Sequence, residues 1–88
     1  MKIWFKIWKD TRLIKDSTVT RNEDDTRTHK VYAALEEACH GFDIGLPMWL
    51  KKNINDFKRS SRCRFYQDNF NESIDFDYLE MLVLEEDD

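Results

Sequence analysis

The sequence predicts a single α+β domain, in which a small antiparallel sheet of about four strands carries one main helix packed on one face. Residues 2–9, 62–67 and 78–85 alternate their side chains with the two-residue period of a strand. Residues 26–40 instead repeat apolar side chains at the spacing of an amphipathic helix. A chain of 88 residues has room for one hydrophobic core, so we expect one domain over 1–88.

The first two strands are expected to form a hairpin. In residues 2–9, β-branched and aromatic side chains alternate between the two faces of a strand. Asp10 and Thr11 make a two-residue turn, although it lacks the glycine of the tightest hairpins. Residues 12–20 are more polar and basic, which suits a strand at the edge of the sheet.

The clearest helical pattern lies in residues 26–40. Asp25 or Thr26 can accept hydrogen bonds from the free N–H groups at its start. Gly41 is expected to take the left-handed conformation that ends many helices. The apolar stripe of this helix consists of Val31, Leu35, Ala38 and Phe42.

The second half of the chain is expected to hold a short helix and two strands. The helix covers about 50–59, where the apolar side chains at helical spacing are Leu50, Ile54 and Phe57. A polar, acidic stretch over 68–77 connects the strand at 62–67 to the strand at 78–85. The latter strand is apolar on both faces and therefore belongs in the middle of the sheet.

The charges are sorted into blocks along the chain. Residues 1–22 carry six basic and two acidic groups, and residues 44–66 carry six basic groups and one acid. Residues 23–43 carry six acids and two bases, whereas residues 67–88 carry nine acids and no base. The formal net charge of −4 therefore hides strong local fields.

These blocks predict which strands are neighbours. Strands 2–9 and 78–86 are the most apolar and carry complementary charges, so we expect them side by side. Strand 62–67 is expected to pair with 78–86 as well, because opposite charges on facing positions stabilise a sheet by roughly 0.2–1 kcal/mol per pair. The last residues, about 85–88, are expected to form a short acidic tail in solvent.

Two tryptophans form the first candidate binding feature. Trp4 and Trp8 lie with Lys6 on the face of strand 2–9 opposite its isoleucines. We favour the interpretation that the second helix or the 42–50 connection covers them, because monomers rarely leave large apolar patches bare. The alternative is an exposed face that binds a partner or stacks on nucleic-acid bases.

A basic segment forms the second candidate. Its members are Lys51, Lys52, Lys58, Arg59, Arg62 and Arg64. Such a cluster can bind phosphates, with Phe65 and Tyr66 nearby for stacking. A pI of about 5.1 argues against a dedicated nucleic-acid binder, and pairing with the acidic strand also explains the arginines.

The sequence contains no motif for catalysis or metal binding. His29 and His40 are eleven residues apart, too far along one helix to hold the same ion. Cys39 and Cys63 are too few for a disulfide scaffold, although one bridge between them is a possible pairing. Phosphate loops and nucleophile elbows are also missing from the sequence. We therefore expect no enzyme activity, no cofactor and no metal.

The start of the chain does not have the apolar run of a signal peptide, because Lys6 and Lys9 interrupt it. No stretch approaches the 18 apolar residues of a membrane span. We therefore expect a soluble cytoplasmic protein.

Several segments together resemble a family of small, uncharacterised bacterial proteins, over nearly the whole chain. The segments are 24–31, 47–50 with Asn53, 57–58, 65–70 and 74–80. The family carries no known activity, so the resemblance implies neither a substrate nor a site.

We expect a non-enzymatic protein-interaction module of a soluble bacterial protein. Charge blocks suit electrostatic steering of a protein partner, and a homodimer is one version of this expectation. The alternative is a nucleic-acid-binding module that uses the basic 51–64 segment.

Overall fold

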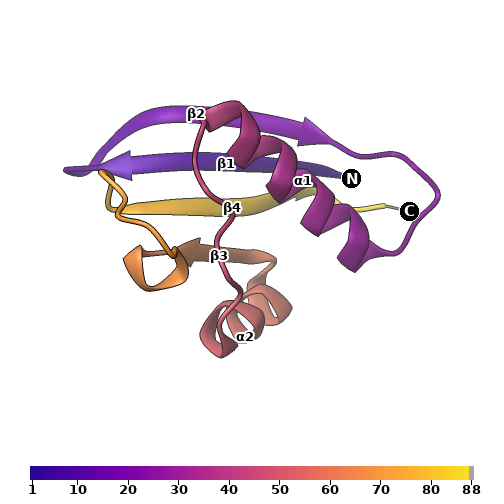
Figure 1. Ribbon diagram of the computed structural model, residues 1–88. Coiled ribbons are helices and arrows are strands. Elements are labelled where there is room, and N and C mark those ends of the chain that lie inside the picture. Colours follow the sequence, from indigo (N-terminus) through magenta and orange to yellow (C-terminus); the bar gives the residue numbers. More distant parts are fainter. Residues whose placement is uncertain (88) are drawn as a thin grey trace.

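The computed structural model describes residues 1–87 and has the predicted α+β fold. A four-stranded antiparallel sheet with the order β2-β1-β4-β3 carries the main helix on one face (Figure 1). The elements are β1 (Lys2–Lys9), β2 (Arg12–Thr20), α1 (Arg27–Phe42), α2 (Lys51–Ser60), β3 (Arg62–Phe65), the short 3-10 helix η1 (Gln67–Asn69) and β4 (Tyr78–Glu85).

The hairpin between β1 and β2 turns at Asp10 and Thr11, as predicted. Both residues have a positive φ, 51° and 63°, which a two-residue turn of this twist requires. The Asp10 N–H donates to Asp77 Oδ2 at 2.9 Å, so a distant side chain holds the turn without a glycine. β2 forms an edge of the sheet, as its polar sequence predicted.

β1 and β4 are the two central strands, which confirms that the strands from the two ends of the sequence are neighbours. β3 pairs with β4, also as predicted, but ends at Phe65 rather than at residue 67. The reason is local: Asn69 Oδ1 accepts a hydrogen bond from the Tyr66 N–H at 2.9 Å and turns the chain into η1.

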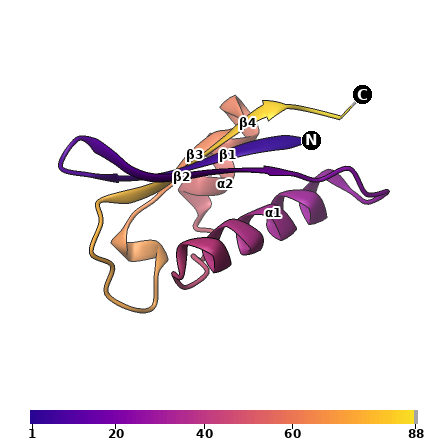
Figure 2. The ribbon, with the colours of Figure 1, turned by 90° about the horizontal axis from the view of Figure 1, so that it is seen from above.

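The core lies between the sheet and α1 (Figure 2). Its sheet side includes Ile3, Phe5 and Ile7 of β1. α1 contributes the predicted stripe of Val31, Leu35, Ala38 and Phe42, together with Ala34 and Cys39. The helical pattern therefore identified the correct buried face.

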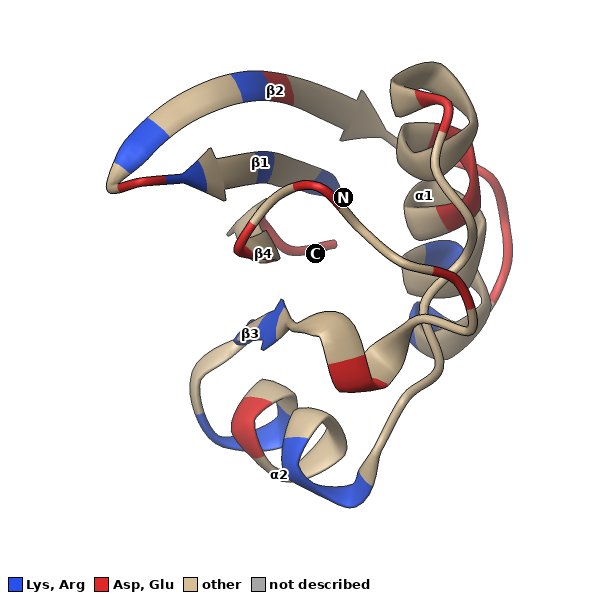
Figure 3. Ribbon diagram, turned by 60° about the vertical axis from the view of Figure 1, so that its left-hand side comes forward, with Lys and Arg blue, Asp and Glu red and all other residues tan. Residues whose placement is uncertain are grey.

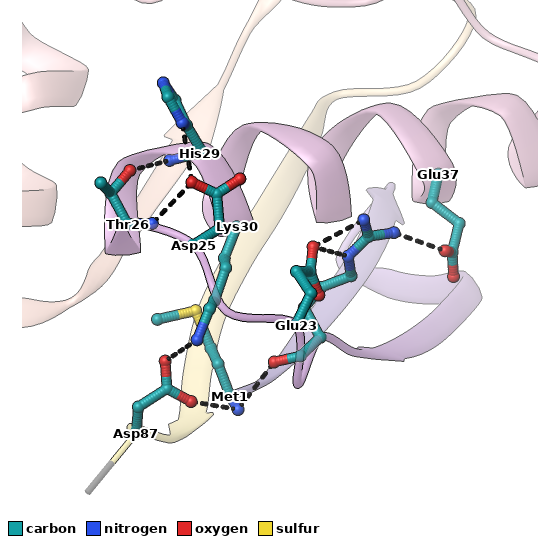
Figure 4. Close-up of polar contacts among 9 residues, drawn as sticks. Met1, Glu23, Asp25, Thr26, His29, Lys30, Glu37 and Asp87 are labelled. Atoms are coloured by element: carbon teal, nitrogen blue, oxygen red, sulfur yellow. Dashed lines mark hydrogen bonds and ion pairs between the residues drawn. The ribbon is translucent and has the colours of Figure 1, made fainter.

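α1 begins as predicted but ends later. Thr26 Oγ1 accepts a hydrogen bond from the His29 N–H at 3.2 Å and caps the first turn (Figure 4). The prediction that Gly41 takes the left-handed conformation is wrong, because Asp43 takes it instead, with a φ of 59°. The two extra helical residues keep Phe42 in the core, and aspartate is one of the few residues that tolerate the left-handed conformation.

α2 is joined to the sheet through two buried asparagines. Asn53 Oδ1 accepts hydrogen bonds from the Leu50 N–H at 3.0 Å and from Asn69 Nδ2 at 2.7 Å. Asn53 Nδ2 donates to the Arg64 carbonyl at 2.8 Å, and Asn69 Nδ2 also donates to the Met48 carbonyl at 2.7 Å. This network fixes α2 and the preceding connection to β3.

Glu85, Glu86 and Asp87 of the acidic tail predicted for about 85–88 are exposed, as expected, but each also pairs with a basic group of the fold. Glu85 ends β4, and Glu86 Oε2 lies 2.9 Å from Arg27 Nη2. Asp87 bridges Lys30 and the N-terminal amine of Met1, whose nitrogen is 2.7 Å from Asp87 Oδ1 (Figure 4). Asp88 lies outside the described residues.

Candidate functional site

One face of the sheet has no helix on it, and we call it the open face. α1 covers the opposite face, and α2 packs along the edge strand β3 (Figures 2 and 3). The open face is formed by Leu13, Asp16 and Thr18 of β2, Trp4, Lys6 and Trp8 of β1, Tyr78, Glu80 and Leu82 of β4, and Arg62 and Arg64 of β3.

Trp4 and Trp8 both lie on the open face and are half-buried. The favoured prediction that α2 or the 42–50 connection covers them is wrong. The connection runs on the α1 side, where Ile44 and Trp49 pack against the core. Each tryptophan is partly buried by a row of side chains that lies between the two rings.

That row crosses all four strands with alternating charge. Asp16, Lys6, Glu80 and Arg64 lie directly opposite one another in the strand register. Lys6 Nζ is 3.1 Å from Glu80 Oε1, and Arg64 Nε is 3.0 Å from Glu80 Oε2. We call these four residues the charge row.

Glu80 is the centre of the charge row, and only 4% of it is exposed. Burial alone would raise the pKa of its carboxyl group. The hydrogen bonds from Arg64 and Lys6 outweigh this effect, so the net result is a pKa below the ordinary value. Glu80 is therefore a charged, bonded carboxylate at neutral pH.

The two tryptophans lie on either side of Lys6. Lys6 Nζ is 4.1 Å from the ring centroid of Trp4 and 5.7 Å from that of Trp8, within cation–π range. Trp4 Nε1 donates to Asp16 Oδ2 at 2.9 Å, and Trp8 Nε1 donates to Glu80 Oε1 at 3.2 Å. Both indole N–H groups are thus already bonded within the face.

Two tyrosines continue the aromatic surface toward β3. The Tyr78 ring centroid is 6.5 Å from that of Trp8 and 5.3 Å from that of Tyr66. The Arg64 guanidinium carbon lies 4.8 Å from the Tyr78 centroid. The open face therefore offers rings and apolar atoms around a charge row that sums to zero.

The predicted basic cluster is only partly assembled. Lys52, Arg59, Arg62 and Arg64 line a groove of about 340 Å³ between α2 and β3. Asp56 lies in the same groove and pairs with Arg59 at 2.9 Å. Lys51 and Lys58 are exposed on α2 but do not line this groove.

A second groove, of about 250 Å³, lies between α1 and α2. Tyr32, Trp49 and Ile54 contribute rings and apolar atoms to it, with Arg27 and Lys58 at its sides. Sequence reasoning missed this groove, because Trp49 follows Pro47 in a connection without periodicity. The helical spacing of Ile54 was the only available signal.

The two cysteines do not provide a reactive group. Cys39 and Cys63 are both free and buried, so the bridge considered from the sequence is not formed. Burial raises the pKa of both thiols to about 12, which keeps them protonated at neutral pH. Neither thiol is therefore a nucleophile.

Residues 1–87, the part of the chain that the structure describes, contain neither a metal-binding cluster nor a helix that could span a membrane. No group of three His, Cys, Asp or Glu side chains is arranged to hold a metal ion in this part of the chain. No described helix has the length and apolar character needed to cross a membrane.

Comparisons with family models, with curated proteins and with solved structures gave no match to this chain. The resemblance to a family of small bacterial proteins therefore stays a prediction.

Proposed function

We propose that this domain is a non-enzymatic protein-binding module that uses the open face to bind its partner. The observation that carries the proposal is an uncovered sheet face with two tryptophans and two nearby tyrosines. Tryptophan, tyrosine and arginine are the residue types that contribute most to protein interfaces. A soluble bacterial protein of the cytoplasm fits the two buried free thiols, which suit a reducing compartment.

The polar groups of the open face favour a protein over a nucleic acid. Phosphate binding needs cations that can give up their counterions, but Lys6 and Arg64 are already bonded to Glu80. The charge row brings no excess positive charge to the face. An aromatic surface around a balanced charge row is better matched by the apolar and polar side chains of a protein.

A photo-cross-linking experiment in native cells tests the proposal. A photoreactive phenylalanine analogue replaces Thr18, which is exposed and lies opposite Trp4 on the open face. The control carries the same analogue at Glu36, an exposed position on α1 on the other side of the sheet. We expect protein adducts from position 18 and none of the same mass from position 36.

The absence of any protein adduct at position 18 would contradict the proposal. Identical adducts from both positions would show non-specific contact and would also count against the open face.

The groove between α2 and β3 supports a second candidate function, nucleic-acid binding through the basic 51–64 segment. Lys52, Arg59, Arg62 and Arg64 line this groove with one acid, Asp56. Arg59 and Arg64 are already paired with Asp56 and Glu80, so this function depends on Lys52 and Arg62 rather than on the tryptophans.

A titration with mixed single-stranded DNA and RNA tests the second candidate. The double variant Lys52→Gln, Arg62→Gln removes two groove cations, whereas Lys51→Gln, Lys58→Gln removes the same charge outside the groove. If the groove binds phosphate, only the first variant reduces the salt slope, by about 0.7 per lost contact. An equal effect of the two variants, or no binding at low salt, would exclude the groove.

A further inference from the structure

We infer that the partner of the open face is a second copy of this chain, related to the first by a two-fold axis that runs parallel to the strands between β1 and β4. This inference rests on the proposed function, because it identifies the protein that the open face binds. It is argued from the order of charges and rings across the sheet.

The charge row is complementary to itself when it is reversed. Its charges read minus, plus, minus, plus from Asp16 through Lys6 and Glu80 to Arg64. A two-fold axis parallel to the strands lays β2 over the partner's β3 and β1 over the partner's β4. Asp16 then faces the partner's Arg64, and Lys6 faces the partner's Glu80.

The neighbouring rows fit the same arrangement. One row runs from Thr18 through Trp4 and Leu82 to Arg62, so Trp4 faces the partner's Leu82. In the next row, Trp8 faces the partner's Tyr78. Apolar groups meet apolar groups, as the isologous interface of a two-fold dimer requires.

The other two-fold axis that keeps the strands of the two copies aligned runs across the strands, along the charge row. It places each strand over its own copy, so Asp16 faces the partner's Asp16 and Arg64 faces the partner's Arg64. Like charges in contact oppose association. The charge row therefore selects the axis parallel to the strands.

The size of the face predicts how stable this dimer is. β1, β2 and β4 are each about 25–30 Å long and β3, with four residues, about 13 Å, so at about 4.8 Å spacing the face has an area of about 450 Å² per copy. This area lies at the lower end of specific interfaces. We therefore expect a reversible dimer with a dissociation constant of about 1–100 µM.

Thr18 provides a test that separates the two axes. It is exposed, and the inferred dimer places it opposite the partner's Arg62. Thr18→Glu adds an attractive pair twice per dimer, whereas Thr18→Lys adds a repulsive pair twice. Asn71→Glu and Asn71→Lys are the matched controls, because they place the same charges at an exposed position of the 70–77 segment, which lies on the α1 side of the sheet.

Sedimentation equilibrium of the full chain over about 1–500 µM measures the dissociation constant of each variant. We expect Thr18→Glu to tighten the dimer and Thr18→Lys to weaken it, each by about threefold to tenfold, with little change from the Asn71 variants. High salt should reduce both effects.

Two results would overturn the inference. The first is an unmodified chain that stays monomeric at about 500 µM. The second is a dimer whose dissociation constant changes in the same direction in both Thr18 variants, or changes no more in them than in the Asn71 variants.

The cross-linker at position 18 separates these failures from failure of the proposed function. Adducts to a different protein, with a monomeric purified chain, contradict the second copy but keep the protein-binding role. No adduct at all contradicts both.

Discussion

Glu80 connects the two cationic side chains that lie between the aromatic rings of the open face. Glu80→Gln removes the counter-charge of Lys6 and Arg64 and leaves Lys6, which is largely buried, without a bonded anion. We expect the free energy of unfolding to fall by about 2 kcal/mol, less than for a fully buried pair because Arg64 is half exposed. Urea denaturation measures this change.

Glu85→Gln is the matched control for this prediction. Glu85 pairs with Lys2 across the same two strands at 3.4 Å, but both side chains are exposed. Its loss should cost less than about 0.5 kcal/mol. Equal effects of the two variants would mean that the charge row does not stabilise the sheet.

The same carboxylate predicts how stability depends on pH. The pKa of Glu80 is lowered from its ordinary value of 4.5, because the bonds from Arg64 and Lys6 outweigh burial. A folded-state pKa below that of the unfolded chain gives stability that is fully present above about pH 4.5 and is lost as pH falls through the folded value. Asp87, whose pKa the Lys30 and N-terminal bonds also lower, adds to the effect.

Urea denaturation at a series of pH values between 7 and 3 checks this dependence. Glu80→Gln should lose less stability than the unmodified chain over this interval, since one of the titrating groups has been removed. Parallel curves for the two proteins would refute the assignment.

At the scale of single residues, the sequence predicted which face of the sheet a side chain lies on, but not which residues it contacts there. The alternation in 2–9 placed Trp4, Lys6 and Trp8 on one face correctly. It could not predict what surrounds them, because Glu80 and Arg64 reach them only through strand register between distant segments. Register depends on the assembled sheet, and no local pattern contains it.

At the scale of elements, the end of α1 offers a substitution that should stabilise the protein, whereas most substitutions destabilise it. Gly41 is helical rather than left-handed, and a Cβ added there meets no atom within 4 Å. Gly41→Ala should therefore stabilise the protein by about 0.5–1 kcal/mol, because alanine loses less backbone entropy in a helix. Thermal or urea denaturation measures the gain, and a destabilised variant would contradict the helical assignment.

The attachment of α2 gives a second prediction at this scale. Asn53→Ala leaves the Leu50 N–H and the Arg64 carbonyl without their side-chain partner. We expect a loss of about 2–3 kcal/mol, because buried polar groups without hydrogen bonds are costly. Asn55→Ala, at an exposed position of the same helix, should cost less than about 0.5 kcal/mol. Similar losses from both variants would mean that the asparagine network does not hold α2.

The strands at both ends of the sequence were predicted with their correct bounds, because their alternation is long and regular. The end of α1 was wrong because the helix continues to bury Phe42, a tertiary effect that outweighs the local preference of Gly41. β3 was predicted too long because the side chain of Asn69 redirects the backbone at Tyr66. Local patterns thus identified the elements, and long-range contacts decided where they end.

At the scale of the whole molecule, the charge blocks pair in part with one another inside the fold. The acidic block at 67–88 supplies Glu80 to Lys6 and Arg64 and supplies Glu86 to Arg27. The sequence showed that the blocks are complementary but left open whether they pair internally or face a partner. The candidate site was likewise predicted only in part. Its residues come from all four strands, and only the pairing of these strands brings them together.

The strand order also has a consequence for biosynthesis. Of the described elements, β1 leaves the ribosome before all others, yet one of its two neighbours, β4, follows all of them and is more than 65 residues away in sequence. Until Glu85 has emerged, Ile3, Phe5 and Ile7 belong to a two-stranded hairpin, which is only marginally stable in water. The nascent chain therefore keeps this apolar strand without one of its partners while residues 10–77 are made, and its sheet closes only after synthesis has passed β4.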